Sequence, residues 1–171
     1  MISIEGNVGV GKSTVLGELE NVREERVDSW TLLPAFYRDS KKYSFAFQLQ
    51  VVASYADAEV SYLERSAHSA YHVFSAILHA DGFLDDEEMQ LLKTVIDKLP
   101  KSDHHIYLRL PAEQCLERIK KRARNGEESI SLEYLKKIEE RHDAIFKNVI
   151  YLEGHETPSE IARLITQFEV L

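Results

Sequence analysis

A chain of 171 residues, with 44% hydrophobic and 29% charged residues, has the size and composition of one soluble globular domain. Its 21 basic and 29 acidic residues give a net charge of -8, which argues against nucleic acid as the main partner, because such binders need a broad basic surface. The apolar runs are short and interrupted by charges, which argues against a membrane span, and a single cysteine excludes an internal disulfide.

The first residues and the cysteine content also indicate a compartment. Met1 leads directly into an apolar stretch with no basic segment before it, so we expect no signal peptide. The lone Cys115 fits a reducing environment and has no motif that would make it reactive. We therefore expect a cytoplasmic protein with no membrane partner.

Apolar runs alternate with helical patterns along the whole chain. In chain order, we predict a strand at 2–5, a helix from the following loop to about residue 20, a strand at 26–30, a helix at 40–58, a strand at 60–63, helices at 67–78 and 85–99, a strand at 104–110, helices at 112–123 and 131–146, a strand at 149–154 and a helix at 158–168. Strands separated by helices predict a parallel sheet covered on both faces. The fold class is α/β, with three layers and five strands, in a single domain over residues 1–171.

The first loop carries the strongest motif. The stretch GNVGVGKS at residues 6–13 matches the P-loop pattern, with a strand before it and a helix after it. Small residues let backbone N–H groups approach phosphate oxygens, while Lys12 would bridge the terminal phosphates and the Ser13 hydroxyl would bind Mg²⁺. A glycine-rich turn without a ligand is the alternative, which this context disfavours. The residues expected to bind ATP are Gly6, Asn7, Val8, Gly9, Val10, Gly11, Lys12, Ser13 and Thr14.

The P-loop does not by itself name a reaction, because motors, switches and kinases share it. The NKxD motif of switch GTPases is absent, and the chain offers little room for the coupling elements of a motor. Phosphoryl transfer to a small molecule is therefore the leading class.

Further stretches follow the P-loop in an informative order. They are EERVDSW at 24–30, FYRDSKKYSFAFQ at 36–48, ERSAHSAYHVF at 64–74, IYLRL at 106–110 and ERIKKRARNGEESISLEYL at 117–135. In this order they resemble the deoxynucleoside kinases over nearly the whole chain. The resemblance implies that the γ-phosphate of ATP is transferred to the 5′-hydroxyl of a deoxynucleoside, in nucleotide salvage. It also implies a homodimer.

The resemblance implies catalytic roles for several side chains. Glu25 would accept the proton of the 5′-hydroxyl, and Arg65 beside it would keep the carboxylate ionised. Glu64 would assist Mg²⁺ together with Ser13. A lid at about residues 118–130 would close over the phosphates. Its arginines are Arg118, Arg122 and Arg124.

The same resemblance implies a substrate pocket. Tyr37 and Glu127 would hold the sugar 3′-hydroxyl, and Gln48 would pair with the base edge. Relatives that favour deoxycytidine and purines carry an arginine and an aspartate where this chain has Tyr55 and Ala70, which predicts a pyrimidine, thymidine before deoxycytidine. The residues expected to line the pocket are Trp30, Tyr37, Gln48, Val51, Tyr55, Ala70, Phe74 and Glu127.

Simpler interpretations exist for each of these features. Glu25 and Arg65 could form an ordinary surface ion pair, and the basic cluster at 118–124 could be a solvated face. The aromatic residues could be plain core. Two other functions also stay open: a thymidylate kinase, whose acceptor phosphate the Glu25 carboxylate would repel, and a catalytically silent subunit, against which the retained motifs argue.

Two features depart from the family or stand outside the motifs. Arg26 follows Glu25 where the family usually has proline. His68 and His72 are four residues apart on a predicted helix, a spacing able to bind zinc, but no HExxH pattern accompanies them. We do not expect a zinc site there.

Overall fold

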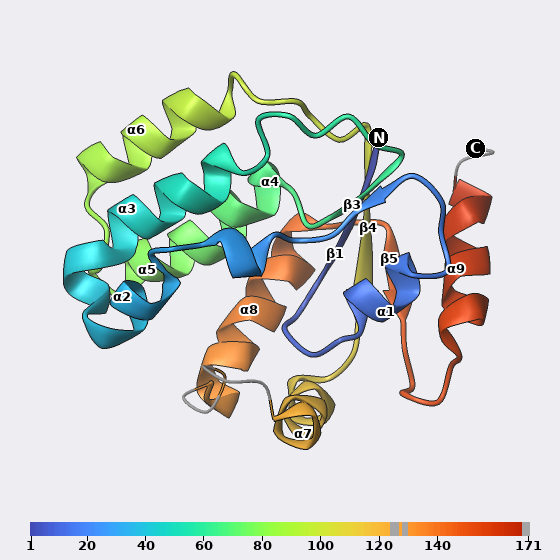
Figure 1. Ribbon diagram of the computed structural model, residues 1–171. Helices are drawn as coiled ribbons and strands as arrows, with labels where there is room; N and C mark the ends of the chain where they lie inside the picture. The colour runs from blue at the N-terminus through green and yellow to red at the C-terminus, as the bar shows by residue number, and fades with distance from the viewer. Residues whose placement is uncertain (124–126, 128–129, 169–171) are drawn as a thin grey trace.

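The computed structural model describes residues 1–123, 127 and 130–168. Its centre is a five-stranded parallel sheet with the strand order β2-β3-β1-β4-β5, which confirms the predicted α/β class (Figure 1). The strands are β1 (Ile2–Gly6), β2 (Val22–Arg23), β3 (Tyr62–Glu64), β4 (His104–Arg109) and β5 (Val149–Tyr151). All five residues of β1 are buried, as expected for a central strand that helices cover on both faces.

Helices lie on both faces of the sheet. On one face, α1 (Lys12–Leu16) packs against α9 (Pro158–Gln167) (Figure 1). The other helices in chain order are α2 (Leu33–Arg38), α3 (Ser40–Ala53), α4 (Ala67–Ser69), the π-helical turn η2 (Ala70–Ser75), α5 (Ala76–Ala80), α6 (Asp86–Ile96), α7 (Ala112–Arg122) and α8 (Leu132–Ile145). None of the helices within the described ranges is long and apolar enough to cross a membrane.

Two apolar clusters hold these layers together. One surrounds β1 and β4 and includes Ile4 and Leu108, whose side chains are fully buried. The other lies between α3, α6 and the helical segment after β3, with Val52 and Leu92 at its centre. The second cluster fixes α3 beside the segment that follows β3.

Two predicted boundaries are wrong near the N-terminus. The second strand is β2, a pair of residues aligned with Tyr62 and Leu63, whereas Val27–Ser29 forms a short 3-10 helix, η1. The first helix ends at Leu16 rather than near residue 20. β2 is only two residues long, so pairing with β3 outweighs its local pattern, and the first helix ends where Gly17 caps it.

The helix predicted at 40–58 ends at Ala53, and the helix predicted at 67–78 extends to Ala80 with a π-helical turn inside it. The last strand ends at Tyr151. Other termini follow their capping residues: α6 begins after Asp85 and α9 after Thr157, each in a capping box with the glutamate three residues later.

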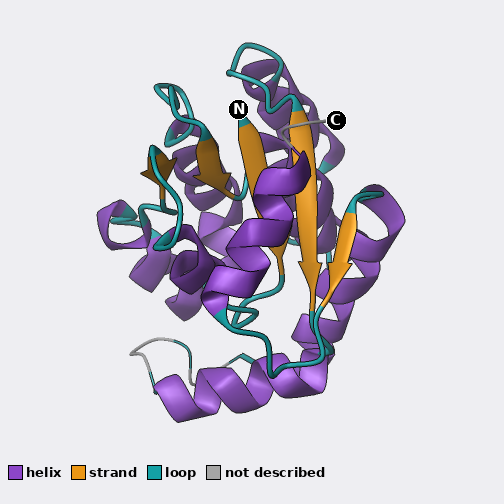
Figure 2. Ribbon diagram, turned by 90° about the vertical axis from the view of Figure 1, so that its right-hand side faces the viewer, coloured by secondary structure: helices purple, strands orange, loops and turns teal. Residues whose placement is uncertain are grey.

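The carboxyl ends of the strands meet at one edge of the sheet, where α7 crosses (Figure 2). The P-loop follows β1 there, Glu25 lies two residues after β2, and Glu64 ends β3. Ligands of open α/β sheets bind at this edge. The parallel order therefore brings together segments that are far apart in the sequence.

Candidate active site

The glycines of the P-loop occupy positions that larger residues could not. Gly9 has φ +84°, and a Cβ atom there would lie 2.7 Å from the carbonyl oxygen of Cys115 on α7. The Asn7 side chain fixes the same loop, because its Nδ2 donates to Leu135 O at 2.9 Å and its Oδ1 accepts from Val8 N at 2.9 Å. The loop is thereby held between α7 and α8.

Lys12 and Ser13 point toward the end of β3. Lys12 is 4% exposed; its Nζ donates to Asn7 O at 3.0 Å and lies 3.8 Å from Glu64 Oε1. Burial lowers the pKa of Lys12 to about 8, with Arg65 adding to the effect and Glu64 opposing it. The Ser13 hydroxyl is 3.2 Å from both carboxylate oxygens of Glu64. The P-loop and the end of β3 thus share one polar network.

The backbone at Arg65 is strained. Its φ is +57°, in the left-handed region that residues other than glycine seldom adopt, while its N–H donates to Ile4 O at 3.0 Å. The next residue, Ser66, caps α4 together with Ser69. Strain of this kind is maintained only where the surroundings fix it and is concentrated at functional sites. The strained residue is also the one whose guanidinium contacts Glu25.

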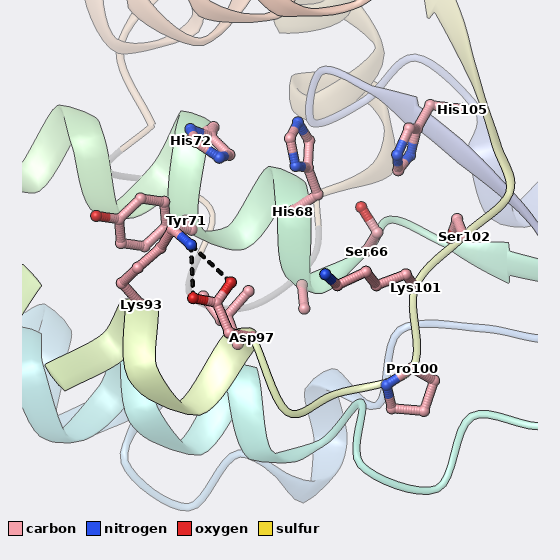
Figure 3. Close-up of a pocket in the computed structure, with 12 residues that line it drawn as sticks. Ser66, His68, Tyr71, His72, Lys93, Asp97, Pro100, Lys101, Ser102 and His105 are labelled. Carbon is pink, nitrogen blue, oxygen red and sulfur yellow. Dashed lines mark hydrogen bonds and ion pairs between the residues drawn. The ribbon is translucent and has the colours of Figure 1, made fainter. Parts of the chain in front are cut away.

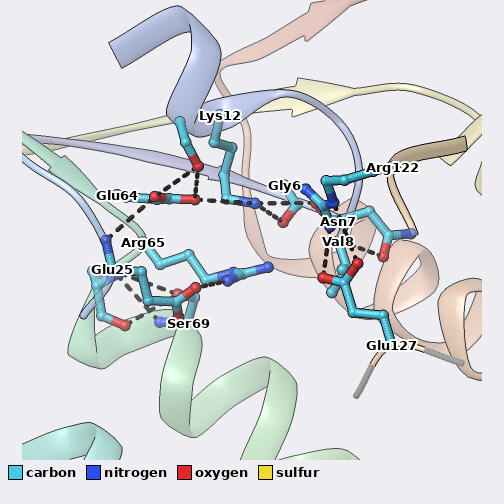
Figure 4. A network of polar contacts seen from close by, with 12 residues as sticks. Gly6, Asn7, Val8, Lys12, Glu25, Glu64, Arg65, Ser69, Arg122 and Glu127 are labelled. Carbon is cyan, nitrogen blue, oxygen red and sulfur yellow. Dashed lines mark hydrogen bonds and ion pairs between the residues drawn. The ribbon is translucent and has the colours of Figure 1, made fainter. Parts of the chain in front are cut away.

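Glu25 joins the same network. Nη1 of Arg65 donates to Oε2 of Glu25, and the two side chains are 8% and 10% exposed. The Glu25 N–H donates to Glu64 Oε2 at 3.2 Å (Figure 4). The Arg65 guanidinium also lies over the ring of Phe74, 4.9 Å from its centroid. The residue expected to act as proton acceptor is therefore connected to the P-loop through one residue, Glu64, which contacts both Ser13 and the backbone of Glu25.

The pKa of Glu25 is raised, although the neighbouring Arg65 alone would lower it. Burial raises the pKa of Glu25, and the charge of Arg65 opposes this rise without cancelling it. A carboxylate with a raised pKa takes up a proton more readily than an exposed one. The environment thus makes the Glu25 carboxylate a stronger proton acceptor than an exposed glutamate.

The arginines expected in the lid differ in their surroundings. Arg118 lies beside the P-loop, donating to Val10 O at 2.8 Å and to Gly154 O at 3.2 Å. Arg122 forms a two-pronged contact with Glu127, at 2.6 and 3.2 Å. Arg124 lies outside the described residues. Helix α7 therefore places Arg118 against the P-loop and Arg122 against Glu127.

Several residues expected in the substrate pocket lie in one cluster on α3 and the segment after β3. Val51, Tyr55 and Ala70 are buried there, and Trp30 packs edge-on against Phe47 with ring centroids 5.7 Å apart. Within the described part of the chain, Trp30 Nε1, Tyr55 Oη and Arg65 Nε are buried polar atoms with no hydrogen-bond partner. Such atoms usually have one, so Tyr55 and Arg65, whose side chains both interact electrostatically with Glu25, favour a polar ligand there.

The other expected pocket residues are less closely grouped. Tyr37 is 46% exposed on α2, and its ring lies 5.8 Å from that of Phe36. Phe74 packs against the cluster around β1 and β4, beneath Arg65, rather than with Tyr55 and Ala70. Gln48 is 4% exposed and faces the π-helical turn, where its Oε1 accepts from Ser75 at 3.0 Å.

The structure adds residues that the motifs did not indicate. Glu5 is fully buried and accepts from Ser66 at 2.6 Å and from Ser3 at 2.7 Å. Burial alone would raise its pKa, but the neighbouring His105, Ser66 and Ser3 lower it to about 2. Glu5 therefore links the strand of the P-loop to the residue that follows Arg65. The only sequence signal was an acidic residue in an apolar strand.

A cavity of about 210 Å³ lies elsewhere, lined in part by His68, His72 and His105 (Figure 3). Neither Glu25 nor Lys12 lines it. The rings of His68 and His72 are 4.3 Å apart, and burial, followed by the neighbouring histidines, lowers the pKa of His68 to about 4. No group of three or more metal-binding side chains is placed to hold an ion within residues 1–123, 127 and 130–168.

Comparison with known proteins identifies the family of the chain. The family model described as deoxynucleoside kinase matches residues 2–168. A protein of Invertebrate iridescent virus 6, provisionally named kinase protein 143R, is 35% identical over 155 residues, covering 83% of this chain and 80% of its own. The thymidine kinase of Ictalurid herpesvirus 1 is 33% identical (82% and 72%), and human mitochondrial thymidine kinase 2 is 30% identical (84% and 63%). The chain therefore belongs to the deoxynucleoside kinase family, and it is a nucleoside kinase.

Proposed function

We propose that the protein transfers the γ-phosphate of ATP to the 5′-hydroxyl of a pyrimidine deoxynucleoside, thymidine before deoxycytidine, in nucleotide salvage. One observation supports this above the others. Glu64 accepts hydrogen bonds from Ser13 of the P-loop and from the backbone of Glu25. The P-loop and the proposed proton acceptor therefore both contact the same carboxylate. The acceptor hydroxyl and the γ-phosphate would meet beside it.

In this proposal Glu25 takes the proton of the 5′-hydroxyl. The 5′-oxygen forms a bond to the γ-phosphorus while the bond from that phosphorus to the β,γ-bridging oxygen breaks, and the leaving group is ADP. The proton ends on the Glu25 carboxylate, and Arg65 holds that carboxylate in place. An alcohol is a poor nucleophile unless its proton has an acceptor, so the group that receives it contributes directly to the rate.

Ser13 and Glu64 are the residues that would hold Mg²⁺. Their side-chain oxygens lie 3.2 Å apart, and oxygen atoms of hydroxyl and carboxylate groups are the ligands that this ion prefers. The donor set therefore fits the ion. When bound, Mg²⁺ would neutralise negative charge on the phosphates.

Cationic side chains would neutralise the remaining charge. Lys12 lies at the loop itself, and Arg118 already contacts its backbone. We propose that residues at about 118–130 act as a lid, with Arg122 and Arg124 also turning toward the phosphates. Arginine suits this task because its forked donors match phosphate oxygens.

The substrate would lie against α3 and the segment after β3. We propose that Tyr37 and Glu127 hold the sugar 3′-hydroxyl and that Gln48 pairs with the base. The walls would be Trp30, Val51, Tyr55, Ala70 and Phe74. Uncharged Tyr55 and Ala70 leave no charged partner for the polar edge of a purine, which favours a pyrimidine.

Two further proposals rest on the family resemblance. We propose that residues 1–171 act as one domain and that the protein forms a homodimer through helices flanking residues 64–66. Light scattering after size-exclusion chromatography measures the dimer directly, and a mass equal to one chain would contradict it.

The substrate proposal is tested by offering thymidine, deoxycytidine, deoxyadenosine and deoxyguanosine in parallel with labelled ATP. Chromatography of the products identifies each 5′-monophosphate. We expect the largest kcat/KM for thymidine, followed by deoxycytidine. A preference for deoxyguanosine would contradict the argument from Tyr55 and Ala70.

A further inference from the structure

Ser75 lies at the end of the π-helical turn and faces α3. It is fully buried. Its Oγ lies 3.0 Å from Gln48 Oε1 and 2.9 Å from Ala70 O, five residues earlier in the same turn. Gln48 itself is 4% exposed, so little water competes for either contact. The hydroxyl therefore links Gln48, which is proposed to pair with the nucleoside base, to the backbone of the turn.

The two acceptors compete for a single hydrogen. A serine hydroxyl carries one donor hydrogen and two acceptor lone pairs. If the hydrogen points to Gln48, the amide oxygen of Gln48 is held at Ser75 and the amide nitrogen faces away. If it points to Ala70 O, the Ser75 oxygen can only accept, and the Gln48 amide must turn its nitrogen toward it. The orientation of the Gln48 amide is thus coupled to Ser75.

The wide turn is what makes this contact possible. A serine in a regular α-helix bonds to the carbonyl four residues earlier. In η2 the partner is the carbonyl five residues earlier, and the hydroxyl also reaches α3. π-Helical insertions of this kind occur frequently at functional sites.

We propose that Ser75 is a specificity-determining positioning residue that holds the Gln48 amide in one orientation. The proposal rests on the function above, in which Gln48 pairs with the base. Thymine presents a donor N3–H beside a carbonyl acceptor, whereas cytosine presents an acceptor N3 beside a donor amino group. An amide held in one orientation complements only one of these edges, and a freely turning amide complements both.

The test compares kcat/KM for thymidine with kcat/KM for deoxycytidine in the same preparation. This ratio is independent of the fraction of active protein, so a general loss of stability does not move it. We expect Ser75→Ala to shift the ratio toward one by about tenfold, the value of one hydrogen bond. Ser75→Cys, which keeps the volume but donates weakly, should act in the same direction, and Ser75→Thr, which restores the hydroxyl, should recover most of the ratio.

Ser44→Ala is the matched control. Ser44 is also fully buried, lies on α3 one turn before Gln48, and donates to the carbonyl of Ser40 at 2.6 Å. Its removal should leave the ratio unchanged.

The outcomes separate the two proposals. An unchanged ratio in both Ser75→Ala and Ser75→Cys, with a changed ratio in Gln48→Leu, would overturn the role of Ser75 and leave the kinase proposal standing. Equal kcat/KM values for the two nucleosides in the unmodified protein would also overturn it. If the unmodified protein phosphorylates no deoxynucleoside, the proposed function itself is wrong.

Discussion

Arg65 and Glu25 form an ion pair whose two side chains are 8% and 10% exposed, although they come from segments 40 residues apart. The pair depends on the left-handed backbone of Arg65 and on the ring of Phe74 beneath the guanidinium. A buried pair of this kind contributes little to stability by comparison with apolar packing. Its location beside Glu64 and the P-loop is better explained by function.

Replacing Glu25 with glutamine tests its role as proton acceptor. Glu25→Gln keeps the size of the side chain but removes its basicity, so turnover should fall at least about a hundredfold. Binding of ATP should persist, because the contacts of Lys12 and Asn7 are unchanged. Single-turnover rates and an ATP titration measure the two effects. Glu24→Gln changes the exposed neighbour and should retain full turnover; equal losses in both variants would contradict the role of Glu25.

The pH dependence of turnover follows from the direction of the pKa shift. Burial raises the pKa of Glu25 above its usual 4.5, despite the opposing charge of Arg65. The proton acceptor must be deprotonated, so turnover should rise as the pH increases through this raised value. A kcat/KM profile for the nucleoside measures the acidic limb, because it reports ionisations of the free protein, in which the shift occurs. An acidic limb whose midpoint lies at or below pH 4.5 would contradict this assignment. So would an acidic limb that persists in Glu25→Gln.

Much of the architecture could be predicted because it follows from local patterns. Alternating apolar runs and helical patterns specify a parallel sheet, and the P-loop motif locates its own strand and helix. The position of β2 could not be predicted, because two residues carry no periodic signal and their strand character comes from pairing with Tyr62 and Leu63. The π-helical turn was missed for a similar reason, since its sequence has ordinary helical spacing.

The site was predicted less completely than the fold. Motifs indicated Lys12, Ser13 and Glu25, but the contact between Ser75 and Gln48 depends on how α3 packs against η2. The direction of the Glu25 pKa depends on burial, which a sequence does not show. Phe74 is predicted to line the substrate pocket, and the structure adds a contact that no motif indicates, with the Arg65 guanidinium over its ring.

Glu5 predicts an acid-sensitive stability. Hydrogen bonds lower its pKa from 4.5 to about 2 despite complete burial, so the folded protein favours the charged form. This contribution, about 3 kcal/mol, is present above pH 4.5 and is lost as the pH falls through about 2. Urea unfolding between pH 6 and pH 3 should therefore show a steeper loss of unfolding free energy for the unmodified protein than for Glu5→Gln. Parallel pH dependences would contradict the shift.

Two glycines with similar backbones separate steric from conformational effects. Gly9 and Gly82 have φ +84° and +76°, but only at Gly9 would a Cβ atom meet other atoms, 2.7 Å from Cys115 O. Gly82→Ala should cost about 1 kcal/mol of unfolding free energy and leave ATP binding intact. Gly9→Ala should weaken ATP binding by more than about tenfold, since the loop must shift to relieve the contact. Thermal unfolding and ATP titration measure both; identical behaviour would contradict the role assigned to Gly9.

The most direct measurement offers thymidine and thymidine 5′-monophosphate separately to the protein with ATP labelled at the γ-phosphate. Because the proposal places the Glu25 carboxylate against the acceptor, we predict label on the 5′-oxygen of thymidine and none on the monophosphate. Labelled diphosphate formed from the monophosphate, with thymidine left unreacted, would contradict the proposal that Glu25 deprotonates a sugar hydroxyl beside the P-loop.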